Sequence, residues 1–164
     1  MALSPDSLAR RALPRIDYLD AYAIDVDPAD DLEAVCTRVF GRPPPLFRLL
    51  MGLRDAVMGP LGLKTTPAGP RGSGALTPGQ RIGIFRILER TPEELLLGED
   101  DRHLDFRVSL RVPGDGSATL ATLVQFRNAW GRLYFFFVRP FHASIARAML
   151  ERAAAGVSAV PAAR

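Results

Sequence analysis

The sequence predicts an α+β protein in which a curved antiparallel sheet of about six strands wraps around a long C-terminal helix. Apolar and polar residues alternate over 16–26 and again from residue 80 onwards, and a period of two is the spacing of a β-strand. Short turns join the later strands, which favours antiparallel neighbours. The last apolar segment, 140–156, has helical spacing and can cover one face of the sheet.

Composition narrows the class of protein. The 164 residues suit one domain with one core, and 48% hydrophobic with 24% charged residues is typical of globular chains. The net charge of +3 comes from arginines interleaved with acidic residues. A nucleic-acid site needs basic residues clustered on one face, so we expect no nucleic-acid partner.

The sequence also predicts a cellular setting. Its one cysteine, Cys36, excludes an internal disulfide. No apolar run reaches the roughly 20 residues that span a bilayer, and the first residues lack the pattern of a signal peptide. We therefore expect a cytoplasmic protein without a membrane partner.

Three parts are expected along the chain: a loose N-terminal arm (1–15), a single domain (16–155) and a disordered tail (156–164). A strand over 16–26 opens the domain. The next segment predicts a helix with Asp30 as its N-cap and Cys36 on its buried side.

A second helix is predicted at roughly 45–59. Its apolar residues form two stripes: Leu46, Leu49, Leu50, Leu53 and Val57 in one, and Phe47, Met51 and Met58 in the other. Such a wide apolar surface needs cover on two sides. The Pro/Gly-rich segment 65–79 lacks the ending of a phosphate-binding loop, so no nucleotide site is predicted there.

The second half of the domain predicts five strands and a helix. The strands cover 80–90, 92–100, 102–112, 118–128 and 133–139, with a hairpin loop at 128–132. The helix covers 140–156, with Pro140 in its first turn and Gly156 at its end. Two helices after the first strand and one closing helix are the layout of a helix-grip fold.

Three stretches also resemble one family. "DYLDAY" (17–22), "GEDDRHLDFRVSL" (98–110) and "GRLYFFFVRPFHASI" (131–145) are similar to the signature stretches of the bacterial domain of unknown function family 2867, over about residues 16–153. The resemblance implies a single domain of helix-grip (START/Bet v 1-like) type. It implies no catalytic residues, because the family is named for lacking a known function.

The strand at 102–112 carries the densest group of ionisable residues. Period two places Leu104, Phe106, Val108, Leu110 and Val112 on one face, and His103, Asp105, Arg107, Ser109 and Arg111 on the other. Neither the ligand set of a metal nor the spacing of a local Ser/His/Asp triad is present. The charged face is therefore either a ladder of ion pairs or an acid–base site, with His103 as acid or base, Asp105 orienting it and Arg107 holding an anion.

Two further residues have alternative interpretations. His142, the second histidine, is either a structural residue at the start of the last helix or a catalytic candidate. Trp130, at the expected hairpin tip, either covers the sheet edge or anchors a partner.

We favour a binding protein over an enzyme, with a small apolar molecule held between the sheet and the C-terminal helix and no cofactor or metal. The expected wall residues are Phe47, Met51, Phe106, Phe126, Tyr134, Phe135, Phe137, Ile145 and Met149. One alternative is an enzyme of the same fold that uses His103, Asp105 and Arg107. The other is a non-catalytic interaction module that forms a homodimer in place of a monomer.

Overall fold

The computed structural model describes residues 3–41, 76–82 and 85–155. The predicted second helix, with Phe47 and Met51, the loop 65–79 except its last residues, and the tail lie outside these ranges. The elements run in the order η1 (Leu8–Arg11), β1 (Tyr18–Asp25), α1 (Leu32–Phe40), β2 (Arg81–Ile82), β3 (Phe85–Arg90), β4 (Glu94–Asp100), β5 (Leu104–Arg111), β6 (Ser117–Phe126) and α3 (Ala129–Ala155).

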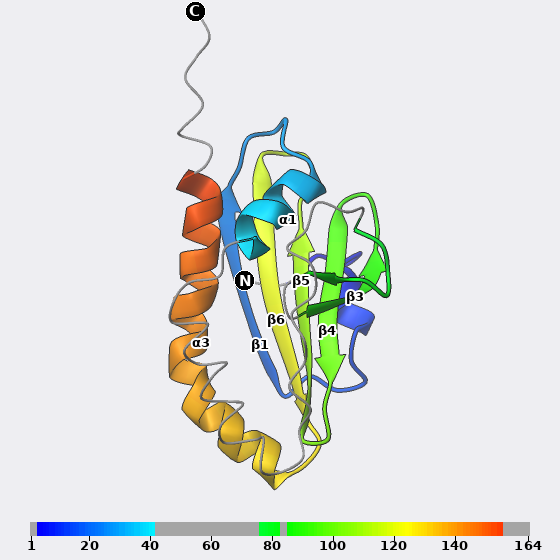
Figure 1. Cartoon of the computed structure of the whole chain (residues 1–164), viewed down its shortest axis with the longest axis vertical. Coiled ribbons are helices and arrows are strands. Elements are labelled where there is room, and N and C mark those ends of the chain that lie inside the picture. The colour runs from blue at the N-terminus through cyan, green and yellow to red at the C-terminus, as the bar shows by residue number, and fades with distance from the viewer. Residues whose placement is uncertain (1–2, 42–75, 83–84, 156–164) are drawn as a thin grey trace, which may run out of the picture.

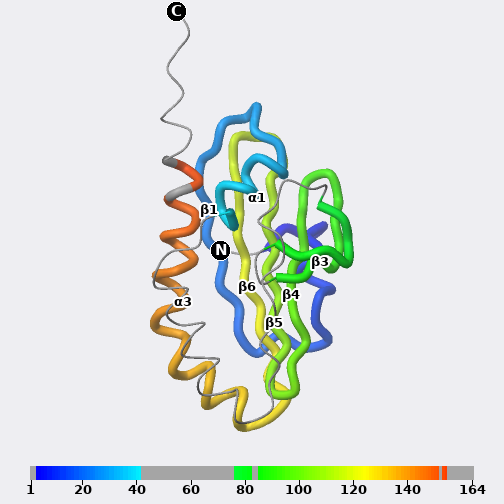
Figure 2. Tube along the Cα trace, viewed as in Figure 1, coloured from blue at the N-terminus to red at the C-terminus, as the bar shows by residue number. Residues whose placement is uncertain are grey.

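The six strands form one antiparallel sheet in the order β1-β6-β5-β4-β3-β2. The sheet curves, and α3 runs along its β1 side while α1 crosses the same face nearer the middle (Figure 1). The tube view shows the same arrangement (Figure 2). This confirms the predicted α+β class, and the arrangement is compatible with a helix-grip fold.

The chain from residue 128 to 140 differs from its prediction. The expected hairpin loop and the strand at 133–139 are both part of α3, which begins at Ala129 and has Pro140 in its interior. The prediction is wrong because aromatic residues favour strands and because apolar side chains on both sides of this helix hide its period. Pro140 cannot donate to the carbonyl four residues earlier, and α3 curves along its length (Figure 1).

Asn128 and Gly131 determine where α3 begins and how closely it approaches the sheet. The side chain of Asn128 accepts a hydrogen bond from the amide of Gly131 at 3.1 Å, as an N-cap does. A Cβ atom on Gly131 would lie 2.1 Å from the carbonyl oxygen of His103. Only glycine therefore lets the helix approach β5 this closely.

Two smaller predictions also change. The single strand expected at 80–90 is two strands, β2 and β3, which pair with each other as Ile82 does with Phe85. The N-cap of α1 is Asp31, whose side chain accepts from Ala34, and not Asp30. The predicted number of strands is right only because this extra strand replaces the one lost to α3.

The two faces of the sheet have different covers. We call the face under α1 and α3 the helix face and the opposite one the outer face. Val108 and Leu110 of β5 belong to the core beneath the helices, and Phe106 packs against it. The alternation predicted for this strand is thus confirmed, and its charged side chains belong to the outer face.

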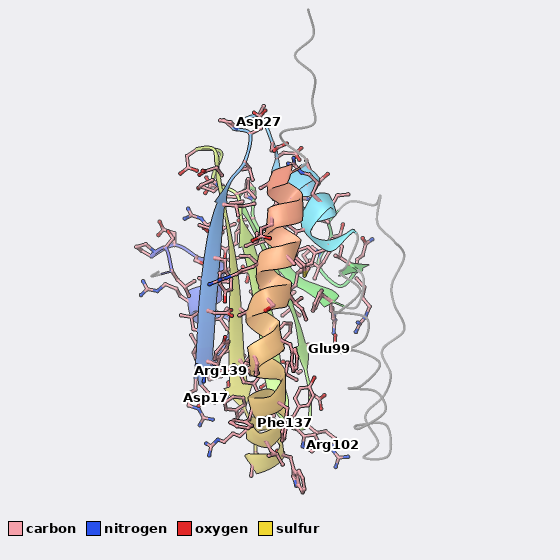
Figure 3. All side chains as sticks on the ribbon, turned by 90° about the vertical axis from the view of Figure 1, so that its left-hand side faces the viewer. Asp17, Asp27, Glu99, Arg102, Phe137 and Arg139 are labelled. Atoms are coloured by element: carbon pink, nitrogen blue, oxygen red, sulfur yellow. The ribbon has the colours of Figure 1, made fainter. Side chains whose placement is uncertain are left out.

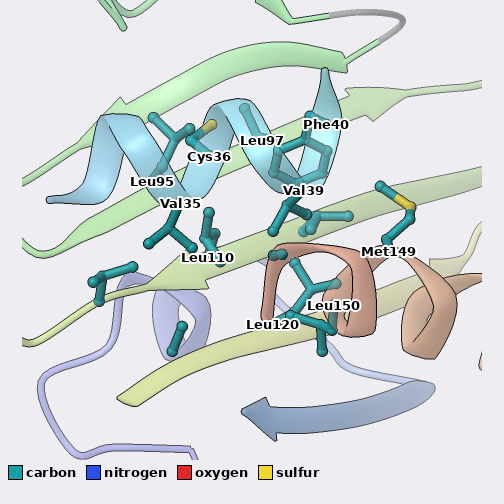
Figure 4. Close-up of a cluster of buried hydrophobic side chains, with 14 of the residues drawn as sticks. Val35, Cys36, Val39, Phe40, Leu95, Leu97, Leu110, Leu120, Met149 and Leu150 are labelled. Atoms are coloured by element: carbon teal, nitrogen blue, oxygen red, sulfur yellow. The ribbon is translucent and has the colours of Figure 1, made fainter. Parts of the chain in front are cut away.

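The core joins α1, the sheet and α3. Its buried side chains include Val35, Val39, Leu95, Leu97, Leu110, Leu120, Met149 and Leu150 (Figure 4). Burying each stabilises the fold by about 1.5–3 kcal/mol relative to exposure. Cys36 is part of this core, as predicted, and burial raises the pKa of its thiol to about 12.

The outer face is covered in part by the N-terminal segment. Ser7, Leu8, Ala9 and Leu13 are buried, and Ala9 and Leu13 pack against Leu123 of β6. This differs from the loose arm that the sequence predicts. The polarity of the segment suggested an arm, but Leu3 packs against the same cluster as Ala9 and Leu13.

Glu94 of β4 anchors this segment. Its carboxylate is 3% exposed and accepts from the Ser7 hydroxyl (2.7 Å), the Leu8 amide (2.9 Å) and the Ser109 hydroxyl (2.5 Å). The amide of Ala9 donates to the same carboxylate at 3.4 Å. A buried carboxylate is stable only with such a set of donors.

We expect Glu94→Ala to lower the free energy of unfolding by about 2–4 kcal/mol, because it leaves buried donors without an acceptor. Urea unfolding measures the change. Glu93→Ala is the control: Glu93 pairs with Arg111 at the surface and should cost less than about 1 kcal/mol. Equal losses in the two variants would contradict the role given to Glu94.

Candidate functional site

A polar cluster lies inside the contact between β1 and α3. Period two places Tyr18, Asp20 and Tyr22 of β1 on the helix face. Their partners on β6 are Val124, Thr122 and Leu120, respectively. The apolar side chains of Val124 and Leu120 therefore lie on either side of the Asp20–Thr122 pair. A carboxylate in such surroundings needs polar partners.

His142 of α3 is one of these partners. Its Nε2 atom lies 3.5 Å from the Oδ2 atom of Asp20, and the side chains are 16% and 12% exposed. The pair is an ion pair when the imidazole is protonated. His142 lies in the middle of the helix, seven residues after buried Phe135 and four before buried Ala146, and these spacings keep it on the buried side.

Two phenols share the same carboxylate oxygen. The hydroxyl of Tyr18 donates to Asp20 Oδ2 at 2.9 Å and that of Tyr22 at 3.4 Å. Burial and the bond to Asp20 raise the pKa of Tyr18 to about 12, so this phenol stays protonated and remains a donor. The guanidinium of Arg139 lies 5.6 Å from the centre of the Tyr18 ring and that of Arg147 lies 5.3 Å from the Tyr22 ring.

The pKa of Asp20 reflects this balance. Burial acts to raise it, but the interactions with His142, Tyr18 and Thr122 outweigh burial and hold it below its ordinary value of 3.8. Asp20 is therefore an anion at neutral pH. Its other oxygen, Oδ1, is buried and makes no hydrogen bond of good geometry with a described residue. The cluster can accept a further donor at this atom or orient the imidazole for proton transfer.

An aromatic group adjoins the cluster. The Phe135 ring lies edge-on to Tyr18 with centroids 4.7 Å apart, and 5.5 Å from the ring of Phe126. On the middle of the helix face, Phe106 stacks on Phe85 at 5.8 Å. The polar atoms of the cluster are thus bordered by aromatic and apolar surface.

The other predicted wall residues lie in different settings. Ile145 and Met149 are buried in the core, and Tyr134 is partly buried. Phe137 is 63% exposed and lies on a side of α3 away from Arg139 (Figure 3). The structure therefore brings most described wall residues to the helix face but leaves Phe137 at the surface.

The candidate acid–base residues His103, Asp105 and Arg107 each contact a different partner. Nδ1 of the His103 ring lies 3.0 Å from Nδ2 of Asn128, the cap of α3. Asp105 is held by Arg127 through two contacts of 2.8 and 2.9 Å, and Arg107 pairs with Asp100 at 2.6 Å. Asp105 and Arg107 are therefore held in ion pairs, whereas His103 contacts an uncharged amide.

The period-two pattern could have revealed the polar cluster. Alternation along the first strand puts Tyr18, Asp20 and Tyr22 on one side of it. His142 is harder to connect, because its position depends on extending α3 back to Ala129. The histidine was expected at a helix start and lies instead in mid-helix against β1.

The described residues contain neither a metal-binding group nor a membrane-spanning helix. No three His, Cys, Asp or Glu side chains among them are arranged to hold a metal ion. None of the helices in this part of the chain has the length and apolar character to cross a membrane.

We expect Asp20→Asn to lower the free energy of unfolding at pH 7 by about 1–3 kcal/mol, because hydrogen bonds to a buried charge are lost. The pKa of Asp20 is lower in the folded chain than its ordinary value of 3.8. Its stabilisation is therefore complete above that value and is lost as the pH falls through the folded pKa. Urea unfolding at several pH values should show the difference from the wild type shrinking towards pH 3.

Asp25→Asn is the matched control, since Asp25 is an exposed aspartate on the same strand. It should change stability by less than about 0.5 kcal/mol. A deficit of Asp20→Asn that persists undiminished below the folded pKa would contradict the assignment.

Comparison with known proteins identifies one family. Residues 12–149 match the family model described as Protein of unknown function (DUF2867). No curated protein matches the chain, and no solved structure matches it.

Proposed function

We propose that this chain, which belongs to the DUF2867 family of proteins of unknown function, binds a small apolar molecule between the helix face of the sheet and α3. The polar cluster of Asp20, His142, Tyr18 and Tyr22 orients the molecule. The observation that carries the proposal is the buried Oδ1 atom of Asp20, which makes no hydrogen bond of good geometry with a described residue.

The surroundings of the cluster support this class of ligand. Small-molecule sites combine apolar and aromatic walls with a few polar groups. Here Phe126 and Phe135 border the cluster on one side, and Phe106, Ile145 and Met149 lie along the same face. The acceptor at Asp20 favours a molecule with a hydroxyl or other donor, because a ligand carboxylate would face a second negative charge.

Catalysis has weaker support. An acid–base site needs its groups to converge on one reacting atom. His103, Asp105 and Arg107 do not converge, as their separate partners show. The pair of His142 and Asp20 has the chemistry for proton transfer, but the role proposed for it is to hold the ligand.

We expect at least one alcohol to raise the melting temperature of the wild type. The test is a thermal-shift panel of matched alcohols and acids: decanol and decanoate, geraniol and geranate, 2-naphthol and 2-naphthoate. At 100 times its Kd, a ligand adds about 2.7 kcal/mol of stability, or roughly 5–10 °C for a chain of this size.

The same panel is then applied to Asp20→Asn and Asp25→Asn. The first should bind the alcohol about tenfold more weakly, because a hydrogen bond to a charged group is worth about 1.4 kcal/mol or more. The second should bind like the wild type. If no compound stabilises the wild type, or if the two variants respond alike, the proposed function is wrong.

A second candidate function is self-association through α3. The helix exposes Trp130, Leu133, Phe136, Phe137 and Phe141, of which Trp130, Leu133, Phe137 and Phe141 follow the spacing of a helix–helix contact. These four side chains carry no charge, and Arg139 lies on another side of the helix, over the Tyr18 ring of β1. An uncharged apolar stripe suits a second copy of the same helix.

We expect a homodimer at micromolar concentration in analytical sedimentation if this second function holds. Phe137→Ser should then shift the chain to monomer without lowering its stability, because the side chain is 63% exposed. Ser144→Ala, an exposed change on the same helix, is the control. A wild type that is monomeric throughout would exclude self-association as the function of this stripe.

A further inference from the structure

A depression of about 530 Å³ lies on the outer face of the sheet, at the end of β6. Residues 13–15 of the N-terminal segment form one wall, and the floor includes Asp105 and Arg107 of β5. Its volume falls within the usual range of small-molecule sites, about 300–1,000 Å³. The charged face of β5 thus borders a recess, although His103 is not among the lining residues.

Ion pairs make the floor rigid. Asp105 is 5% exposed, and both of its oxygens contact Nε of Arg127, at 2.8 and 2.9 Å. Arg107 donates to Asp100 at 2.6 Å and to the carbonyl oxygen of Phe106 at 3.0 Å. Both terminal nitrogens of Arg107 thus have partners within the protein, and Asp105 holds Arg127 in one orientation.

Two groups at the floor retain hydrogen-bonding capacity. The side chain of Arg127 is 50% exposed and bonds to described residues only through Nε. Its two terminal nitrogens can therefore serve as a fork for an anion. Gln125, directly across from Asp105 in the sheet register, has a buried Oε1 atom that bonds to no described residue. The donor fork and the acceptor are thus two residues apart at the end of β6.

The residues that line the depression determine which charge and shape a ligand must have. Three arginines and two aspartates line the depression together with Leu13 and Phe126. This balance favours one negative charge over two, since the aspartates repel a polyanion. The apolar pair can contact a hydrophobic side group.

We propose that this depression binds a small amphoteric molecule of the amino-acid type, whose carboxylate bonds to the fork of Arg127 and whose ammonium group donates to Oε1 of Gln125. Asp100 and Asp105 lie beside the ammonium group and balance its charge. Its polar groups lie on the opposite face of the sheet from Asp20, although Phe126 at the end of β6 borders both sites.

The test is a titration of the full chain, followed by ¹H–¹⁵N NMR, with L-phenylalanine and two analogues that each lack one group. Phenylalaninamide lacks the carboxylate, and 3-phenylpropanoate lacks the amine. We expect L-phenylalanine to shift the amide signals of residues 105–107 and 125–127. Each analogue should bind at least tenfold more weakly.

Two variants test the assigned roles. Gln125→Met keeps the length of the side chain but removes the acceptor, and should weaken L-phenylalanine about tenfold while leaving 3-phenylpropanoate unchanged. Arg127→Lys keeps a cation beside Asp105 but removes the fork, and should weaken both. Gln80→Met, outside the depression, is the control and should bind like the wild type.

Three results would overturn the proposal. One is the absence of localised shifts at millimolar L-phenylalanine. Another is equal binding of L-phenylalanine and both analogues, which would indicate contact with the apolar wall alone. The third is a Gln125→Met variant that binds L-phenylalanine as the wild type does.

Discussion

The pairing register between β5 and β6 determines the rest of the structure. It sets Val108 opposite Thr122 and Leu110 opposite Leu120, so the apolar side chains of both strands meet on the helix face. A shift of one residue would exchange the two faces of a strand and would turn Arg107 and Ser109 into the core. Because the register holds, α1 and α3 have an apolar surface to cover. The outer face retains the buried polar contacts through which Glu94 anchors the N-terminal segment.

The alternation of side chains between the two faces of a strand also explains why a carboxylate lies beneath α3. Tyr18 and Tyr22 face the core, so Asp20 between them must do so as well. The free-energy cost of burying the Asp20 carboxylate is offset by its contacts with the two phenols and with His142. His142 can reach Asp20 only when α3 lies at one position along β1. We infer that this contact fixes how far α3 slides along β1, since a buried polar pair can specify register even where it adds little stability. The placement of Ile145 and Met149 over the sheet then follows from the position of His142.

Sequence patterns predict the strands of this chain better than its last helix. Strict alternation of apolar and polar residues predicts which side chains of β5 lie on each face of the sheet. Turn residues such as Gly114 and Gly116, both at positive φ, mark the end of this strand. The first half of α3 is missed because "LYFFFVR" is apolar all round and rich in strand-forming residues. Asn128 and Gly131 mark the true start of α3. Their roles depend on the N-cap hydrogen bond and on the close approach to His103, which only the three-dimensional structure shows. The meeting of Asp20 with His142 joins residues 122 positions apart, and no local pattern encodes such a contact.

We propose that an apolar molecule lies between the sheet and α3 beside Asp20. An isotope-filtered nuclear Overhauser spectrum of the chain with its best-binding alcohol tests this location directly. We expect cross-peaks from the ligand to the methyl groups of Ile145 and Met149 and to the ring of Tyr18. Cross-peaks confined to Leu13 on the outer face, or to the exposed ring of Phe136, would place the molecule elsewhere and contradict the claim.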